Sequence, residues 1–564
     1  MNAAPTVASP AVPEPGVTVA GLRDFSDRLS PMLVKELRQG MRSPVFVWGL
    51  IAMNLFLVMI VWLTIEAPAS EDLNQAFFGA YCVLVCGLLP LRGANALNEE
   101  LRGNTIDTLV LTRLSGWRIT LGKWIAVAAQ QLLTTVTVLP YLIVRYFAGG
   151  LNVPLEMAWL GIFLLLGLLS AAVLTGFSWV KYFLLRAGIM LGVTAAAGSF
   201  CAGVLEDMYD YHNSYIIDEM HERYGWTCFA LALTAVLHVM FYALDIGAAQ
   251  VAAVSENRTT RRRLIGLAAV GIYVALSWGA YRNSLAGGPH HREDSMVAVG
   301  CVLAILTSLV LILQSLLEKP ANLAPVLQPF VKRGFAGRLA GRVLYPGWPS
   351  GVIFSLMLFL TALGIGAFTA WRAWENRYTG YGYSGYRSGA PFDLSDVSMN
   401  DWAVAICGFA VIPFTLPVPL VLYHWFFRRR LNWHLGTYAL MLTLMASAQL
   451  LLIALAAGLT NADFLKIGVP IPTMSWAWLE YIARDDYYFN VRAAAGEPPD
   501  PNILNWTRPL LIVISLAVGA FWWIMAVWLS LRAFRETAAV ERHLKLKPGA
   551  EQLTSGDGSE ISTA

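Results

Sequence analysis

The run Val45–Glu66, VFVWGLIAMNLFLVMIVWLTIE, decides the fold of this chain because it holds no charged residue before its last position. A helix of roughly 20 apolar residues is long enough to cross the hydrocarbon core of a bilayer. Eleven further apolar runs, bounded by charges or by Gly and Pro, follow it. They are Ala76–Leu91, Trp124–Phe147, Leu155–Val180, Ala187–Leu205, Trp226–Val251, Leu264–Tyr281, Met296–Leu317, Gly351–Trp371, Trp402–Phe427, Thr437–Leu459 and Pro509–Leu531.

The composition agrees with lipid as the main solvent of the chain. Of its 564 residues, 57% are hydrophobic and 14% are charged, whereas soluble domains carry roughly 25% charged residues. The net charge of +3 gives no reason to expect a nucleic-acid partner. We therefore predict an all-α fold, a polytopic membrane helix bundle of about twelve transmembrane helices in contact with the lipid bilayer.

The two ends of the chain differ from these runs. Residues 1–29 are rich in Pro, Ala and Val and predict a disordered cytoplasmic tail, and residues 532–564 are expected to form a cytoplasmic tail. Between the first tail and the first run, Ser30 and Pro31 have the residue types of an N-cap and a first helical residue. Apolar and basic residues then alternate at helical spacing, which predicts an amphipathic helix in the cytoplasmic interface, with an ordinary surface helix as the alternative. The apolar residues are Leu33, Leu37 and Met41, and the basic ones are Lys35, Arg38 and Arg42.

The basic residues give the orientation. With a cytoplasmic N-terminus, 29 of the 40 Lys and Arg residues fall in cytoplasmic segments. Such an excess is typical of cytoplasmic loops. We therefore expect a multi-pass protein of the cell membrane, plasma or inner, with both termini in the cytoplasm.

The six cysteines show no pattern of a disulfide framework or a metal site, because all of them lie within apolar runs and none has metal-ligand spacing. We expect six free core thiols. They are Cys82, Cys86, Cys201, Cys228, Cys301 and Cys407.

The segment Glu99–Lys123, after the second run, carries most of the functional information. Thr105 can cap a short helix, and Ser115 can cap the helix that leads into the third span. Three apolar residues of this short helix form a stripe outside the bilayer that needs a partner to bury it. We refer to Ile106, Leu109 and Val110 as the apolar stripe.

This segment resembles the loop after the second span of ABC-2 type permeases, whose pattern reads approximately Glu-Arg-x-x-Gly-Thr-Leu-Glu-x-Leu, Thr-Pro-Leu-Ser and Ile-x-x-Gly-Lys. The resemblance covers residues 30–263. The matching residues are Glu100, Thr105, Leu109, Thr112, Leu114, Ser115, Ile119, Gly122 and Lys123.

The resemblance implies a permease subunit in which residues 30–263 form a six-span domain, and a separate ATP-binding subunit docks on this loop. It also implies a homodimer, or a heterodimer with another permease. Residues 264–531 are then a second six-span membrane domain with no second copy of the motif. The docking residues expected from the resemblance are Glu99, Glu100, Arg102, Thr105, Ile106, Leu109, Val110, Thr112, Leu114 and Ser115.

The chain itself is expected to bind no nucleotide or other cofactor, and not to be an enzyme. Five residues separate Gly116 from Gly122 where a phosphate-binding loop has four, and Trp124 stands where Ser or Thr would coordinate magnesium. The acidic segment Glu206–Arg223 is interpreted as a solvated outer loop and not as a cation site.

Two polar residues lie within the sixth run. His238 and Asp245 are seven residues apart and share a helix face. They are interpreted equally well as the lining of a polar path or as members of a buried interhelical hydrogen bond.

Three other functions compete with a permease. An ion-coupled secondary transporter would show paired broken helices, and a membrane enzyme of glycan or lipid metabolism would show clustered acid, base or metal residues at one face. A membrane scaffold without transport activity is the third.

Overall fold

The computed structural model describes residues 31–66, 71–98, 115–148, 153–180, 182–207, 225–252, 256–287, 291–319, 324–378, 406, 409–410, 412–427, 433, 436–445, 447 and 507–546. Within these residues the chain is helical and contains no β-strand. Helices satisfy their own backbone hydrogen bonds, which a segment surrounded by lipid requires. The predicted all-α fold class is therefore confirmed.

Ten of the described helices are long and apolar enough to cross a membrane, and they correspond to the first nine predicted runs and to the last one. Runs ten and eleven are described only in part, as the shorter apolar helices Ile412–Phe427 and Gly436–Met445. Pro413, Pro417 and Pro419 interrupt the tenth run. Because proline lacks an N–H and clashes with the preceding turn, it breaks regular helix there.

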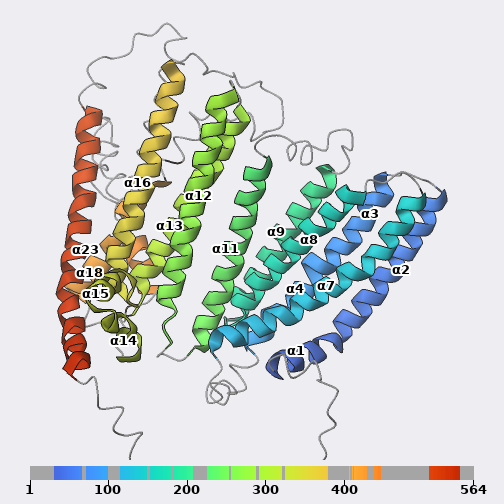
Figure 1. Cartoon of the computed structure of the whole chain (residues 1–564), viewed down its shortest axis with the longest axis horizontal. Helices are drawn as coiled ribbons and strands as arrows, with labels where there is room; N and C mark the ends of the chain where they lie inside the picture. Colours follow the sequence, from blue (N-terminus) through green and yellow to red (C-terminus); the bar gives the residue numbers. More distant parts are fainter. Residues whose placement is uncertain are drawn as a thin grey trace, which may run out of the picture. The chain divides into compact units, whose positions relative to one another are not determined.

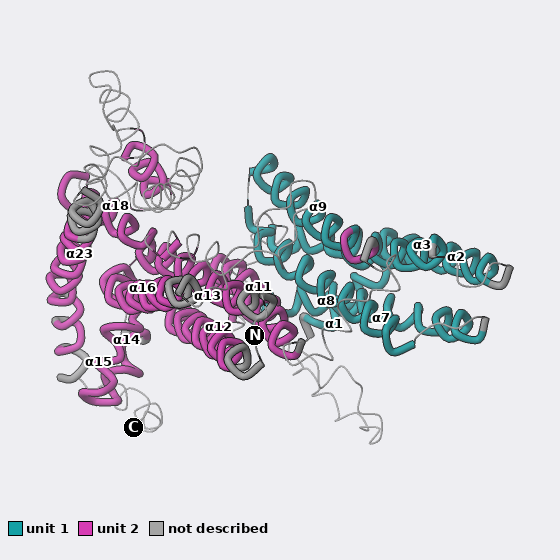
Figure 2. Tube along the Cα trace, turned by 90° about the horizontal axis from the view of Figure 1, so that it is seen from above, with its two compact units in different colours: residues 1–103, 118–202 teal, residues 104–117, 203–564 magenta. Residues whose placement is uncertain are grey.

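Two compact units make up the chain (Figure 2): residues 1–103 with 118–202, and residues 104–117 with 203–564. This division by contacts differs from the sequence domains 30–263 and 264–531, whose boundaries stay a prediction.

Figure 1 colours the elements by their order in the chain. The first unit contains α1 (Pro31–Met41), α2 (Pro44–Glu66), α3 (Glu71–Cys82), the π-helix η2 (Val83–Leu88), α4 (Leu89–Leu91) and the 3-10 helix η3 (Arg92–Asn95). It also contains most of α7 (Gly116–Ala148), α8 (Val153–Gly176) and most of α9 (Phe183–Asp207). The second unit contains α11 (Gly225–Val251), α12 (Thr259–Gly287), α13 (His291–Leu317), α14 (Ala324–Lys332), α15 (Gly334–Leu344) and α16 (Trp348–Tyr378). Its remaining elements are η5 (Ile412–Phe414), α18 (Pro417–Leu422), the π-helix η6 (Tyr423–Phe427) and α23 (Thr507–Leu546).

Helix α1 begins at Pro31, as its residue type predicts, and it is amphipathic. Its basic residues Lys35 and Arg38 are exposed. The opposite side is attached to the first unit: Glu36 pairs with Lys123 of α7 at 3.0 Å, and Arg92 of η3 donates to the Gly40 carbonyl at 2.9 Å. The helix is thereby anchored beside the start of α2.

The interior of the first unit is formed by α3, η2, α7 and α8. Phe78 and Tyr81 of α3 are fully buried against Phe163 of α8. Gln131 of α7 donates to the Val85 carbonyl of η2 at 2.9 Å. The π-helix η2 lies just before Pro90, whose missing N–H removes the α-helical partner of the Cys86 carbonyl.

One cysteine pair contradicts the sequence prediction. Cys82 at the end of α3 and Cys201 of α9 form a disulfide, so the expectation of six free thiols is wrong for these two. Cys86, Cys228 and Cys301 form no disulfide, and Cys407 lies outside the described residues. The pairing brings together residues that are 119 positions apart in the chain, which spacing alone does not reveal.

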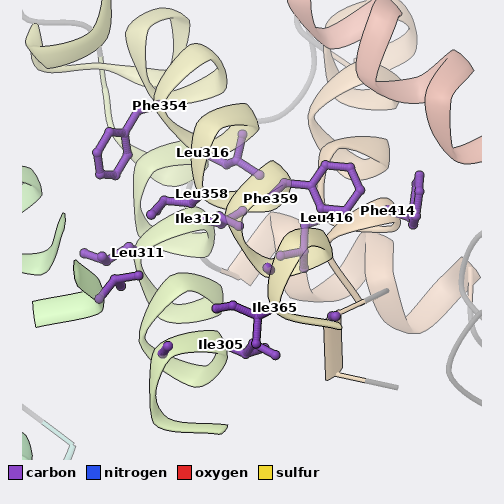
Figure 3. Packing of buried hydrophobic residues seen from close by; sticks show 14 of the residues in the cluster. Ile305, Leu311, Ile312, Leu316, Phe354, Leu358, Phe359, Ile365, Phe414 and Leu416 are labelled. Atoms are coloured by element: carbon purple, nitrogen blue, oxygen red, sulfur yellow. The ribbon is translucent and has the colours of Figure 1, made fainter. Parts of the chain in front are cut away.

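The interior of the second unit is a continuous apolar cluster between α13, α16 and η5 (Figure 3). Ile312 and Leu358 are fully buried there, and Phe414 packs edge-on against Phe359 at 4.6 Å between ring centroids. The other side of Phe359 stacks on Trp523 of α23 at 5.3 Å. This cluster holds the helices on which the polar residues described next are mounted.

Large apolar side chains also cover the outside of the helices. In α2, Trp48, Leu55 and Trp62 are each at least 67% exposed. Repeated exposure of large apolar side chains along a helix of this length matches a surface that faces lipid.

Candidate functional site at the start of helix α12

A network of charges, most of them buried, surrounds the first turn of α12 in the second unit. It starts from Asp245 of α11, which is 1% exposed. Arg262 donates through Nε to Asp245 Oδ2 at 2.5 Å, and Arg258 lies 3.6 Å from Asp245 Oδ1. The network extends to Glu256, which accepts from Arg258 at 2.8 Å.

The charges of this network balance. Asp245 and Glu256 carry two negative charges, and Arg258 and Arg262 carry two positive ones. A buried ion is tolerated when it is paired and hydrogen-bonded, whereas removal of one partner leaves an uncompensated buried charge. The four residues are therefore one electrostatic unit.

The local sequence explains why the arginines reach this position. Asn257 accepts a hydrogen bond from the Thr260 backbone N–H at 3.3 Å, which fixes the start of α12. Successive residues of a helix point about 100° apart, so Arg261, Arg262 and Arg263 face three different neighbours.

Arg263 makes a second ion pair. It is 1% exposed and donates to Glu318 Oε2, just beyond α13, at 2.6 Å. It also donates to the Val343 carbonyl of α15 at 2.6 Å and to Ser350 Oγ of α16 at 2.9 Å. Arg263 thus joins the start of α12 to three other elements of the second unit.

Arg261 contacts the segment that follows the predicted docking loop. Its guanidinium lies 4.2 Å from the centroid of the Trp117 ring, in cation–π geometry. Trp117 also contacts Phe241 of α11 at 5.3 Å between centroids. The Gly116 backbone N–H donates to Glu256 Oε2 at 3.4 Å.

Gly116 allows the close approach that this contact needs. A Cβ at this position would lie 2.7 Å from the Ala248 carbonyl oxygen and 3.0 Å from the Ala252 nitrogen. Only glycine fits against the end of α11 without displacing backbone. Gly116 and Trp117 therefore lie against the end of α11 and the start of α12, next to the charge network.

The two predicted polar residues of the sixth span have different surroundings. Asp245 lies in the network. His238 stacks on Tyr242 with ring centroids 6.0 Å apart, and its Nδ1 has no hydrogen-bond partner among the described residues. Tyr242 is hydrogen-bonded to Gln314 of α13, whose amide can also contact Arg262. Asp245 thus forms hydrogen bonds to another helix, as the second of the two interpretations expects. The lining of a polar path stays a prediction.

The predicted docking residues lie almost entirely outside the described part of the chain. Of Glu99, Glu100, Arg102, Thr105, Ile106, Leu109, Val110, Thr112, Leu114 and Ser115, only Ser115 is described, directly before α7. The structure therefore places the residues that follow the loop, and docking on the loop itself stays a prediction.

Sequence reasoning missed the roles of Arg258 and Arg262, which served only as charges that precede the run Leu264–Tyr281. It also missed a buried pair in the first unit. Arg145 of α7 lies 3.7 Å from Glu156 of α8 and donates to Asn74 Oδ1 at 2.9 Å. Ionisable residues within a span are functional candidates by default, and Glu156 inside the fourth run was the signal that could have revealed it.

One group of possible metal ligands occurs among the described residues. The sulfur atoms of Cys82, Cys86 and Cys201 lie within 4.8 Å of one another. Because Cys82 and Cys201 are bonded to each other, only the Cys86 thiol is left to coordinate, and we assign no metal to the group.

The ten long apolar helices define an all-α, multi-pass membrane protein. No protein-family model, no curated protein and no solved structure matches the chain.

Proposed function

We propose that this chain is the membrane-spanning permease subunit of an ABC-type transporter, which moves its substrate with ATP hydrolysed by a separate subunit. One observation carries the proposal: Gly116 and Trp117, which directly follow the predicted docking residues, contact Glu256 and Arg261 at the start of α12. A loop that receives force from a partner needs a firm attachment to the helices that move.

The buried network beneath this attachment favours such a role. Glu256 contacts both Gly116 and Arg258, and Arg258 contacts Asp245. A displacement of the loop would therefore act on paired charges in α11 and α12. The amphipathic helix α1, anchored to α7 through Glu36, supports the proposal because an interfacial helix precedes the spans in the permeases that this sequence resembles.

The apolar stripe provides the test. Full burial of a leucine side chain stabilises an interface by roughly 1.5 to 3 kcal/mol. Leu109→Asp should abolish co-purification of an ATP-hydrolysing subunit from the native membrane, while thermal unfolding of the chain in detergent stays near wild type. The purified chain alone should hydrolyse no ATP.

The matched control is Leu111→Asp, which adds the same charge at a position that helical spacing places opposite Leu109. It should retain the partner. Loss of the partner in both variants, or turnover of ATP by the isolated chain, would refute the proposal. A Leu109→Asp chain that unfolds while its folded fraction keeps the partner would make the stripe structural.

A further inference from the structure

A cavity of about 580 Å³ lies in the second unit, where several helices end or begin. Ligand cavities in proteins are typically about 300 to 1,000 Å³, so this one is large enough for a lipid headgroup with its glycerol. It takes lining residues from the stretch after α13, the start of α16, the π-helix η6 and α23. We call it the aromatic cavity.

The charge of the lining has one sign. Lys319 and Arg532 contribute cationic side chains, and no described residue that lines the cavity is Asp or Glu. Both cations are exposed, and neither forms an ion pair with a described residue. A phosphate or another anion would find two charged donors there.

The walls are aromatic. Tyr345, Trp348, Trp425 and Trp528 line the cavity. Trp348 lies against His424 at 4.4 Å between ring centroids, and Trp528 lies beside Arg532 in cation–π geometry at 5.9 Å. An anion that carries no apolar part would leave these aromatic rings without a partner.

The local structure holds these side chains in place. The π-helix η6 presents the consecutive residues Tyr423, His424 and Trp425 to the cavity, and π-helical turns occur frequently at functional sites. The Tyr345 hydroxyl donates to Glu541 of α23 at 2.7 Å. Burial and this hydrogen bond raise the pKa of Tyr345, so its hydroxyl stays protonated.

The cavity lies at the level where apolar helices meet water. Lys319 is two residues beyond the end of α13, Trp348 is the first residue of a membrane-spanning helix, and Arg532 follows the last predicted apolar run. Tryptophan and tyrosine gather at this level of membrane proteins. Basic pockets between helices at a membrane surface bind anionic lipid headgroups.

From the lining, the charge and the position together, we propose that the aromatic cavity binds an anionic phospholipid. Lys319 and Arg532 contact its phosphodiester, and the tryptophan rings contact its glycerol and the first methylenes of its acyl chains. This binding does not depend on an ATP-hydrolysing partner, so it can be tested in the chain alone.

Native mass spectrometry of the purified, delipidated full chain provides the test. Phosphatidylglycerol should be retained in preference to phosphatidylcholine with the same acyl chains. Two basic side chains near an anionic lipid surface together strengthen binding by more than an order of magnitude, so the double variant Lys319→Gln, Arg532→Gln should lose phosphatidylglycerol affinity roughly tenfold or more. The control Arg535→Gln removes an exposed cation of α23 that does not line the cavity, and it should bind as wild type does.

Three outcomes would overturn the proposal. The double variant could retain phosphatidylglycerol fully, or Arg535→Gln could lose it equally, which would indicate general surface attraction. Deacylated glycerophosphoglycerol could bind as tightly as the lipid, which would make the ligand a soluble phosphate compound. Quenching of wild-type tryptophan fluorescence by chain-brominated phosphatidylglycerol should exceed that by brominated phosphatidylcholine, and this measurement needs no variant.

Discussion

Asp245 is the residue whose removal should disturb the second unit most. It neutralises Arg258 and Arg262, and all three side chains are at least 90% buried. Removal of one partner from a buried ion pair typically costs about 3 to 5 kcal/mol. We expect Asp245→Ala to lower the thermal unfolding temperature in detergent strongly, measured by scanning fluorimetry of the purified chain.

Two further variants show whether unpaired charge is the cause. Asp245→Leu combined with Arg262→Met replaces the closest pair by apolar side chains and should lose less stability than Asp245→Ala. Glu256→Gln alters a residue that is 30% exposed, and exposed pairs contribute about 1 kcal/mol or less. Equal losses in all three variants would show that packing, and not charge balance, governs this region.

At the scale of the elements, the packing of the first residues of α7 against α11 depends on a glycine. Gly116→Ala would place a methyl group within 2.7 Å of the Ala248 carbonyl oxygen, and overpacking of this kind typically costs about 1 to 3 kcal/mol. We expect a lower unfolding temperature and weaker association with the ATP-hydrolysing subunit.

Gly122→Ala in the same helix provides the control. A Cβ at Gly122 meets no described atom within 4 Å, and alanine is preferred over glycine inside a helix by about 1 kcal/mol. This variant should be as stable as wild type or more so. If Gly116→Ala is equally harmless, the contact with α11 does not position the loop.

The sequence was sufficient to predict the long spans, because lipid imposes a minimum length and an apolar surface on each of them. It did not predict the short helices α14 and α15, which lie between two apolar runs. It predicted the ten long helices, from Val45–Glu66 onwards, and the start of α1 at Pro31. It predicted one continuous helix over Trp402–Phe427, because the length of the apolar run was given more weight than the three prolines within it.

The partners of polar residues were much harder to predict. Asp245 and Arg262 lie near the facing ends of two consecutive helices, so counting from the turn could have suggested their pairing. Cys82 and Cys201 could not be paired in this way, since their contact depends on how α3 and α9 align. The contact between Gly116 and Ala248 depends on how closely two backbone segments approach each other, and the residue types alone do not predict that distance.

At the scale of the whole molecule, the basic residues predict both termini in the cytoplasm. Single cysteines at Ser384 and Ser559 test this orientation in a background that keeps Cys82 and Cys201 and replaces the other four cysteines. An impermeant thiol reagent applied to intact cells should label the cysteine at Ser384 and not the one at Ser559. After the cells are opened, both should react, and the reverse pattern in intact cells would invert the orientation.

The disulfide between Cys82 and Cys201 also changes how the chain can be pulled apart. It closes a covalent ring through α7 and α8 with a sequence separation of 119. An extended chain spans about 3.3 to 3.6 Å per residue. A force applied to the two ends of the chain therefore cannot extend the residues inside the ring, which correspond to about 400 Å of contour length. An unfolding motor that extracts this protein from the membrane must therefore pass three strands at once through its pore, the two arms of the ring and the rest of the chain, or wait until the bond is reduced.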